Sequence, residues 1–544
     1  MSAWFDHLII VPVVLPLVTG ASMLLLDERR HALKAALNLV STFALFIAAL
    51  ALLRFTDGPT AGVGVYLLGN WPAPFGIVLA VDRLSALMLA LTAVLALAAL
   101  SFSIARWHRG GAHFHSLFQF LLMGLNGAFL TGDLFNLFVF FEVLLAASYG
   151  LVLHGSGMLR VKAGLHYIAV NLATSLLFLI GVSLIYAVTG TLNMADLATR
   201  VPATSDGDRM LLEAGAAILG IAFLVKAGMW PLCFWLPNAY SVAAPPVAAI
   251  FAIMTKVGVY VVLRLWLLVF GQEAGASAGF GGTWLLIGGM MTVAFGSIGA
   301  LASQDLARLS SFNVLVSSGT LLAVIGVGNL PLTAGALFYL ASSTLAIAAF
   351  FLLVELIERG RDPGADVFAV TMEAFGETGE DEAEAEEEVG VAFPATIAVL
   401  GVSFACCALL IAGLPPLSGF IAKFAMLTAL FEPSGPGAGD GVGLVSWALT
   451  ALLLLSGLAS VIAMTRAGIR TLWSPLERAV PRVRVIEMMP VLVLLFLCLT
   501  LTVQAGPVMR FMQATAHSLH APQAYVHDVL SAPKAQRPSK DDGS

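Results

Sequence analysis

The stretch NLFVFFEVLL (residues 136–145) sets a single glutamate, Glu142, among phenylalanines, leucines and valines. The nearest charged residue before it is Asp133, and the nearest one after it is Arg160. The apolar run around 134–153 is long enough to cross ~30 Å of hydrocarbon as a helix. Inside such a helix an unpaired charge costs roughly 2.5–3.5 kcal/mol on insertion scales. The stretch therefore predicts a membrane helix whose carboxylate has a specific role.

Similar apolar runs recur along the whole chain. The 544 residues are 59% hydrophobic and only 11% charged, whereas a soluble domain carries roughly 25% charged residues. Backbone polar groups inside a bilayer must be satisfied within helices, so we predict an all-α polytopic membrane protein with about 14 transmembrane helices. The predicted spans are 8–26, 33–54, 77–105, 115–131, 134–153, 163–189, 212–236, 246–270, 283–301, 309–327, 332–357, 394–430 (with a break), 443–465 and 487–507.

The basic residues of the connecting loops predict the orientation. Loops after spans 1, 3, 5, 9, 11 and 13 hold fifteen Lys and Arg, and the opposite loops hold only Arg200 and Arg209. Basic loops face the cytoplasm, which places both termini outside. The opening MSAWFDHLII has an acidic residue and no Lys or Arg before its apolar run, so we expect the first helix to be retained. The fifteen residues are Arg29, Arg30, Lys34, Arg106, Arg109, Arg160, Lys162, Arg308, Arg359, Arg361, Arg466, Arg470, Arg478, Arg482 and Arg484.

Two spans are interrupted in similar ways. KAGMWPLCFWLPNAYSVAAPP (226–246) and AGLPPLSGFIAKF (412–424) both place prolines inside an apolar segment, where proline removes a backbone donor and breaks the helix. Two such breaks five spans apart predict two inverted five-helix repeats, about 115–270 and 283–465, each with one discontinuous helix. A simple proline kink in each helix is the alternative.

The expected organisation contains no soluble domain. The one long charged insertion, 358–392, carries eight acidic residues within 377–388. Such a composition is typical of a solvated, disordered loop, and a second interpretation is a cation-attracting antenna at a cytoplasmic entrance. The predicted parts are an N-terminal pair of helices with an outer loop (1–76), a core of spans 3–13 (77–465), a cytoplasmic loop with the last helix (466–507), and a polar C-terminal tail (508–544).

Four ionisable residues lie deep in apolar segments: Glu142, Lys226, Lys256 and Lys423. Burial alone favours their neutral forms, whereas a nearby opposite charge favours the charged forms. One carboxylate and three amines in hydrated cavities therefore suggest a chain of protonatable sites, for which lysine is suited because it loses its proton more readily than arginine. The alternative for each residue is a structural ion pair or a lysine that reaches the membrane surface. Arg264, Arg54 and Arg83 lie nearer helix ends and are interpreted as interfacial anchors.

These segments together resemble a known family. Glu142 on the fifth span, Lys226 before WPLCFWLPNAYSVAAPPVAAIFAIMTKVGVY, and GLPPLSGFIAKF resemble the antiporter-like subunits of respiratory complex I, membrane-bound hydrogenases and multi-subunit Mrp (Mnh or Pha) cation/proton antiporters. DRLSALML (82–89) and QDLARLSSFNVLVSSG (304–319) resemble further family segments. The similarity is greatest to the Mrp D subunit, because Cys233 and Tyr240 stand where other branches usually have histidines, and APP follows.

The resemblance implies a function. The chain would be a proton-translocating subunit of a monovalent cation (Na⁺ or K⁺)/proton antiporter, and not an enzyme, in the bacterial inner membrane with the A, B, C, E, F and G subunits of the Mrp complex. Glu142 and Lys226 would be the coupling pair, Lys256 the central relay site and Lys423 the exit. No cofactor is implied, and a metal site is left unknown. The eleventh span departs from many relatives, because Ser342, Ser343 and Thr344 replace titratable groups, so a relay there needs bridging water.

Two other functions remain open from the sequence. The chain could be a proton-pumping subunit of a redox-driven complex I or hydrogenase. It could also be a structural subunit that carries no ions, in which case replacing the membrane charges would leave transport intact. The four cysteines show no metal-ligand spacing and are interpreted as small apolar residues.

Overall fold

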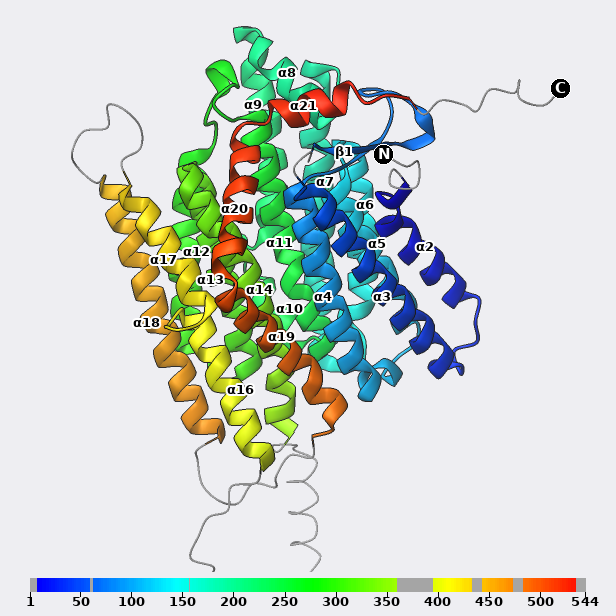
Figure 1. The fold of residues 1–544 in the computed structure, drawn as a ribbon, viewed down its shortest axis with the longest axis vertical. Coiled ribbons are helices and arrows are strands. Elements are labelled where there is room, and N and C mark those ends of the chain that lie inside the picture. The colour runs from blue at the N-terminus through cyan, green and yellow to red at the C-terminus, as the bar shows by residue number, and fades with distance from the viewer. Residues whose placement is uncertain are drawn as a thin grey trace, which may run out of the picture.

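A computed structural model describes residues 7–58, 62–155, 157–359, 395–432, 443–472 and 483–534. The chain forms a helical bundle (Figure 1), and each of the fourteen predicted spans has a helical counterpart. Twelve helices in the described residues are long and apolar enough to cross a membrane, and α2, α5 and α17 are shorter apolar helices. The predicted fold class is confirmed. The helices of the bundle are α2 (Val11–Leu24), α3 (His31–Thr56), α4 (Arg83–Ala105), α5 (Phe114–Leu130), α6 (Leu134–Val152), α7 (Met158–Thr189), α9 (Asp206–Ala227), α10 (Leu236–Val242), α11 (Pro245–Val269), α12 (Gly282–Ala302), α13 (Leu306–Val327), α14 (Leu330–Glu358), α16 (Ala395–Ala412), α17 (Ser418–Phe431), α18 (Leu444–Leu472), α19 (Val485–Val503) and α20 (Ala505–His520).

Short elements gather at one end of the bundle, which we call the hairpin end. Strands β1 (Gly64–Leu67) and β2 (Val78–Val81) pair antiparallel there, with Gly64 opposite Val81. The short helices α8 (Met194–Arg200) and α21 (Gln523–Leu530) lie at the same end (Figure 1). The opposite end, which we call the basic end, carries the loops 25–30, 106–113, 153–155 and 303–305. Several of the predicted cytoplasmic basic residues, among them Arg29, Arg106 and Arg160, therefore lie in or next to these loops.

The centre of the bundle is formed by α11, α13 and α14. These three helices are buried over nearly the whole length that would cross a membrane, whereas α3, α7 and α12 are buried over less than half of it. Their interior nevertheless contains polar side chains, among them Lys256, Ser317 and Ser343. Polar groups at this depth face protein and not lipid, which is the arrangement expected of functional groups in a membrane protein.

Both predicted helix breaks are present. The seventh span is divided into α9 and α10, with residues 228–235 between them, and the twelfth into α16 and α17, with residues 413–417 between them. The helix α9 ends at Gly228, whose φ of 72° is left-handed, a conformation that glycine adopts without the steric cost of a side chain. The inverted symmetry of the two halves stays a prediction.

The structure differs from the expected organisation at the C-terminus. Part of the segment 508–544, expected as a polar tail, forms α20 and α21, and α20 packs against α14. Met512, Ala516 and Leu519 are buried at helical spacing, so a short amphipathic pattern is the signal for this helix. Residues from 535 onward, and the acidic residues 360–394, lie outside the described part of the chain.

Candidate functional site

Glu142 lies on α6, and its carboxylate meets a hydroxyl of the next helix. The helix α6 begins after Asp133, whose side chain accepts a hydrogen bond from the backbone N–H of Asn136 at 2.9 Å. Glu142 lies two turns further along α6, and its Oε1 accepts a hydrogen bond from Ser175 Oγ of α7. Glu142 is half-buried. The carboxylate is therefore held inside the bundle by a neutral donor.

Lys226 lies in the last turn of α9 and is 6% exposed. Its Nζ donates to Asn171 Oδ1 of α7 at 3.4 Å, and it stands 5.2 Å from the centre of the Phe141 ring. An ammonium group over an aromatic face gains electrostatic stabilisation. This amine is therefore bonded through a carboxamide and an aromatic ring, both of them uncharged.

Helix α7 connects Glu142 and Lys226. The sequence suggests that these two residues pair directly, but no Glu142–Lys226 contact within 4.0 Å is among the ion pairs of the described residues. Instead Ser175 binds Glu142 and Asn171 binds Lys226, and Ser175 and Asn171 are one helical turn apart on α7. The expected direct pair is thus replaced by a bridge of two neutral side chains.

Lys256 occupies the centre of α11 and is fully buried. Its Nζ donates to Ser317 Oγ at 2.7 Å and lies 3.3 Å from Ser318 Oγ, both on α13. Two residues further along α11, a Cβ added to Gly258 would lie 2.6 Å from the backbone N of Ala227. The missing side chain at Gly258 lets α11 approach the end of α9, next to Lys226.

Lys423 is held at the second helix break. It lies on α17 and is 8% exposed, and its Nζ donates to the carbonyl oxygen of Ala412 at 2.8 Å. Ala412 is the last residue of α16. The last carbonyls of a helix have no partner within it, so the break supplies the acceptor for this lysine.

Two pairs of serines lie between Lys256 and Lys423. Ser317 Oγ, which binds Lys256, is 2.9 Å from Ser343 Oγ of α14. The neighbouring Ser342 Oγ is 2.8 Å from Ser418 Oγ, which lies five residues before Lys423 on α17. Hydroxyl groups both donate and accept hydrogen bonds. The serines of α14 therefore extend toward both lysines.

A small cavity lies beside these serines. Its volume is ≈ 10 Å³, and Asn313, Tyr339, Ser342, Ser343 and Gly419 are among its lining residues. Asn313 is 2% exposed, and its Oδ1 has no hydrogen-bond partner. A volume of about 10–15 Å³ holds one water molecule if two to four polar partners surround it. The cavity has both the volume and the polar partners for one water molecule. It lies at the eleventh span, where the sequence predicts that a relay needs bridging water.

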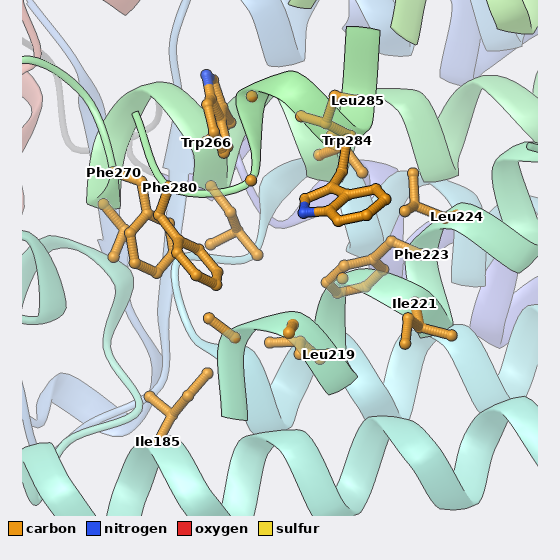
Figure 2. A pocket seen from close by; sticks show the side chains of 18 of the residues that line it. Ile185, Leu219, Ile221, Phe223, Leu224, Trp266, Phe270, Phe280, Trp284 and Leu285 are labelled. Carbon is orange, nitrogen blue, oxygen red and sulfur yellow. The ribbon is translucent and has the colours of Figure 1, made fainter. Parts of the chain in front are cut away.

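A larger cavity of ≈ 640 Å³ lies away from these groups, between α9, α11 and α12. Figure 2 shows its apolar lining, with Phe223, Trp284 and Leu285 around the space. Apolar walls do not favour ions or ordered water. This cavity is therefore not part of the chain of polar groups.

Arg264 is placed differently from expectation. It is 6% exposed, and its two terminal nitrogens donate to the Asp82 carboxylate at 2.6 and 2.7 Å. The interpretation of Arg264 as an interfacial anchor is therefore wrong. The aspartate of the DRLSALML segment is its buried partner, and Tyr525 of α21 packs on the guanidinium at 5.2 Å.

Several of the polar partners are not among the site residues predicted from the sequence. They are Asn171, Ser175, Ser317 and Ser318, each a polar residue inside a long apolar span. The spacing of Asn171 and Ser175, four residues apart on one helix face, is the available signal. The structure thus connects Glu142 with Lys226 through α7, and extends from Lys256 toward Lys423 through α13 and α14.

The comparisons with known proteins agree with this fold. Residues 131–437 match the family model described as NADH:quinone oxidoreductase/Mrp antiporter, TM. The chain is 63% identical over 538 residues to a protein of Rhizobium meliloti (strain 1021) named as the D subunit of a probable K(+)/H(+) antiporter, covering 98% of this chain and 99% of that protein. It is 32% identical over 532 residues to the D subunit of an Na(+)/H(+) antiporter of Alkalihalophilus pseudofirmus, covering 96% and 99%.

Solved structures share the architecture. A chain of the Mrp complex from Dietzia sp. DQ12-45-1b matches with a TM-score of 0.80 at 24% identity, over 97% of this chain and 100% of that one. A chain of respiratory complex I from Thermus thermophilus matches with a TM-score of 0.72 at 23% identity, over 95% and 99%. The expected resemblance to D subunits of Mrp antiporters is confirmed. The chain belongs to the NADH:quinone oxidoreductase/Mrp antiporter family of membrane subunits.

Proposed function

We propose that this chain is the D subunit of a multi-subunit monovalent cation/proton antiporter, and that it carries protons along Glu142, Lys226, Lys256 and Lys423. The observation that carries the proposal is the polar connection between Lys256 and Lys423, in which two serine pairs flank a cavity the size of one water molecule. The name of the Rhizobium meliloti relative favours K⁺ as the exchanged cation.

The proposed relay uses groups that both accept and release protons. A neutral lysine takes a proton from one neighbour and an ammonium group gives it to the next, and serine hydroxyls and water bridge the distances between amines. In the first half, the charge on Glu142 stabilises the ammonium form of Lys226 through space, with α7 holding the two apart. Protonation of Glu142 would remove this stabilisation, so that Lys226 releases its proton toward Lys256.

The chain would work in the bacterial inner membrane with the A, B, C, E, F and G subunits of the antiporter. Fifteen basic residues in one set of loops favour the basic end as the cytoplasmic end and both termini outside. Reporter fusions within 358–392 should behave as cytoplasmic, and fusions within 433–442 as external. A reversed pattern would overturn the orientation.

The test of the relay uses the complete complex in everted vesicles. Glu142→Gln keeps the side-chain shape and still accepts from Ser175, but it removes the charge, so cation-dependent proton exchange should be lost while the complex assembles. Lys256→Met should have the same effect. Glu432→Gln and Lys162→Met change exposed residues and serve as matched controls that retain exchange. Wild-type exchange in an assembled Glu142→Gln complex would show that the carboxylate is structural.

A redox-driven proton pump has the same fold, because complex I subunits match in structure. The named relatives over the full chain are antiporter subunits, and no feature of the described residues favours the redox alternative.

A further inference from the structure

The large apolar cavity between α9, α11 and α12, of ≈ 640 Å³, contains none of the four relay residues. We propose that this cavity, which we call the acyl slot, binds one acyl chain of a membrane phospholipid from the leaflet at the hairpin end. A cavity of about 300–1,000 Å³ is the usual size of a site for a small ligand. The slot is therefore large enough to hold a specific ligand.

The slot runs along the helices and not across them. Its lining on α9 extends from Leu212 to Leu224, twelve residues that rise by about 18 Å. One leaflet covers about half of a hydrocarbon core of ~30 Å. Because α9 begins near α8 at the hairpin end (Figure 1), the slot extends from that end to about the middle of the bilayer. An acyl chain of that leaflet has the same direction and length.

The slot opens on the outer side of the bundle, between α9 and α12. Two of its lining residues, Ile221 of α9 and Trp284 of α12, are 42% and 75% exposed. Further along α12, Ile287 and Met291 are also exposed. The helix α9 packs mainly on α7 and α11, and α12 packs mainly on α13 and α18. The opening is thus bordered by apolar side chains of membrane-spanning helices, so the slot is reached from hydrocarbon and not from water.

The lining selects an apolar ligand. Figure 2 shows Leu219, Phe223 and Trp284 around the same space, and none of the described residues that line the slot is ionisable. An ion or a polar molecule would lose its hydration there without gaining partners. An acyl chain gains from burial and supplies the dispersion contacts that the lining atoms of an unfilled slot lack.

Two tryptophans indicate the level of the headgroup. Trp266, near the end of α11, and Trp284, in the first turn of α12, both line the slot at the hairpin end. Tryptophan is enriched where the hydrocarbon meets the headgroups. A phospholipid with its headgroup at this level would direct one chain down the slot toward Phe223.

The inner part of the slot is connected to the relay by aromatic side chains. The Phe223 ring, which lines the slot, has its centre 6.0 Å from that of Phe141. The Phe141 ring in turn lies 5.2 Å from Lys226 Nζ. A bound chain therefore supports the packing around the last turn of α9. This effect on exchange rests on the proposed function, whereas the binding of the chain does not.

Photolabelling of the complete complex tests the binding. The complex is reconstituted in phosphatidylcholine vesicles that contain a phosphatidylcholine with a diazirine at the end of one acyl chain, and adducts are located by mass spectrometry. Leu219 and Phe223 are 3% and 2% exposed, so adducts on them require a chain inside the slot. Adducts confined to outward residues such as Ile287 and Met291 would overturn the proposal. Labelling of Phe223 by a free diazirine fatty acid but not by the phospholipid would also reject it.

Gly220→Leu places a side chain in the slot. Gly220 lines the slot, and a Cβ added there meets nothing within 4 Å, so the variant should assemble. The leucine shortens the space open to the acyl chain, and labelling of Phe223 should fall severalfold. Gly401→Leu on α16, where an added Cβ also meets nothing within 4 Å, is the matched control with wild-type labelling. Unchanged labelling of Phe223 in Gly220→Leu would contradict the proposed path of the chain.

The same variants test the connection to Lys226. In Gly220→Leu the acyl chain no longer supports Phe223, so exchange in everted vesicles should slow about threefold, whereas Gly401→Leu retains wild-type exchange. Wild-type exchange in a Gly220→Leu complex that has lost the Phe223 adduct would overturn the connection. Labelling does not require transport, so Phe223 should be labelled in Glu142→Gln as in wild type. A failure of the relay and a failure of the acyl slot are therefore distinguishable.

Discussion

At the scale of single residues, the three buried lysines differ in what their amines touch. Lys226 meets a carboxamide, Lys256 meets two hydroxyls, and Lys423 meets a backbone carbonyl. None of these acceptors carries a formal charge. A buried ammonium without a counter-ion is held less firmly than one in a salt bridge, which suits a group that has to release its proton.

Ser317 is the residue on which this view is most easily tested. Ser317→Ala removes the closest partner of Lys256 and its link to Ser343, so exchange should fall about tenfold, the loss expected for roughly 1.4 kcal/mol. Ser310→Ala is the matched control, because its Oγ bonds only the carbonyl of Leu306 within α13. Initial rates in everted vesicles measure both. Equal rates for the two variants would show that the serine is not on the proton path.

Arg264 makes a structural contribution that can be separated from transport. Arg264→Met leaves the Asp82 carboxylate buried and unpaired, which typically costs about 3–5 kcal/mol, so the thermal midpoint of the purified complex should fall clearly. The double variant with Asp82→Asn should recover much of the loss, because asparagine still caps α4 through Ser85 and leaves no charge unpaired. A midpoint as low in the double variant as in the single one would contradict this account.

The residues that the sequence could identify are those whose insertion into a membrane costs much free energy. Glu142 and the three lysines stand out because a charged side chain in an apolar run is costly and is therefore usually functional. Serine and asparagine cost much less, so Ser175 and Asn171 give no comparable signal, although they form the bridge between Glu142 and Lys226. The partner of Arg264 could not be identified from the sequence, because Asp82 lies 182 positions away in the chain.

At the scale of elements, the spacing of helices decides which groups meet. The composition and length of the apolar runs predict the twelve long apolar helices of the described residues, because the bilayer fixes the length of a crossing helix, whereas α2 and α5 are shorter than their predicted spans. The order of helices across the bundle does not follow from these lengths. The interposed position of α7, and the folding of α20 onto α14, depend on packing between surfaces that are distant in sequence.

The contact of α9 with α11 can be changed by a single methyl group. In Gly258→Ala the new Cβ would stand 2.6 Å from Ala227 N and 3.0 Å from Phe223 O, so the helices must separate, at about 1–3 kcal/mol. Because Lys226 lies beside this contact, the exchange rate should fall, and the fall expressed as a free energy should exceed the loss in stability of the complex. In Gly220→Ala the added Cβ meets nothing within 4 Å, and this control should be as active as wild type and equally stable or more so. Unchanged exchange in an assembled Gly258→Ala complex would mean that the spacing of α9 and α11 does not govern the relay.

At the scale of the whole molecule, the polar groups join into two stretches of different character. The first is bridged by α7 near the first helix break, and the second runs through hydroxyls to the second break. Between them the described residues show a close backbone approach, at Gly258 and Ala227, and no hydrogen bond from Lys226 to Lys256. Transfer between the two stretches is thus the step most open to control by small helix movements.

The acidic insertion joins the chain directly after α14, whose last turn lines a cavity of ≈ 460 Å³ at the basic end of the bundle. If the eight acidic residues of 377–388 gather cations at this end, deleting 372–389 should raise the apparent KM for the limiting cation or proton at low ionic strength, without loss of maximal rate. The effect should shrink in high salt, because the Debye length falls from ~30 Å at 0.01 M to ~8 Å at physiological ionic strength. Replacing 372–389 by an uncharged segment of equal length controls for the loss of chain and should give the same defect as the deletion. A KM defect that persists in high salt would reject the electrostatic role, and an unchanged KM at low salt would identify the insertion as a solvated loop without influence on ion uptake.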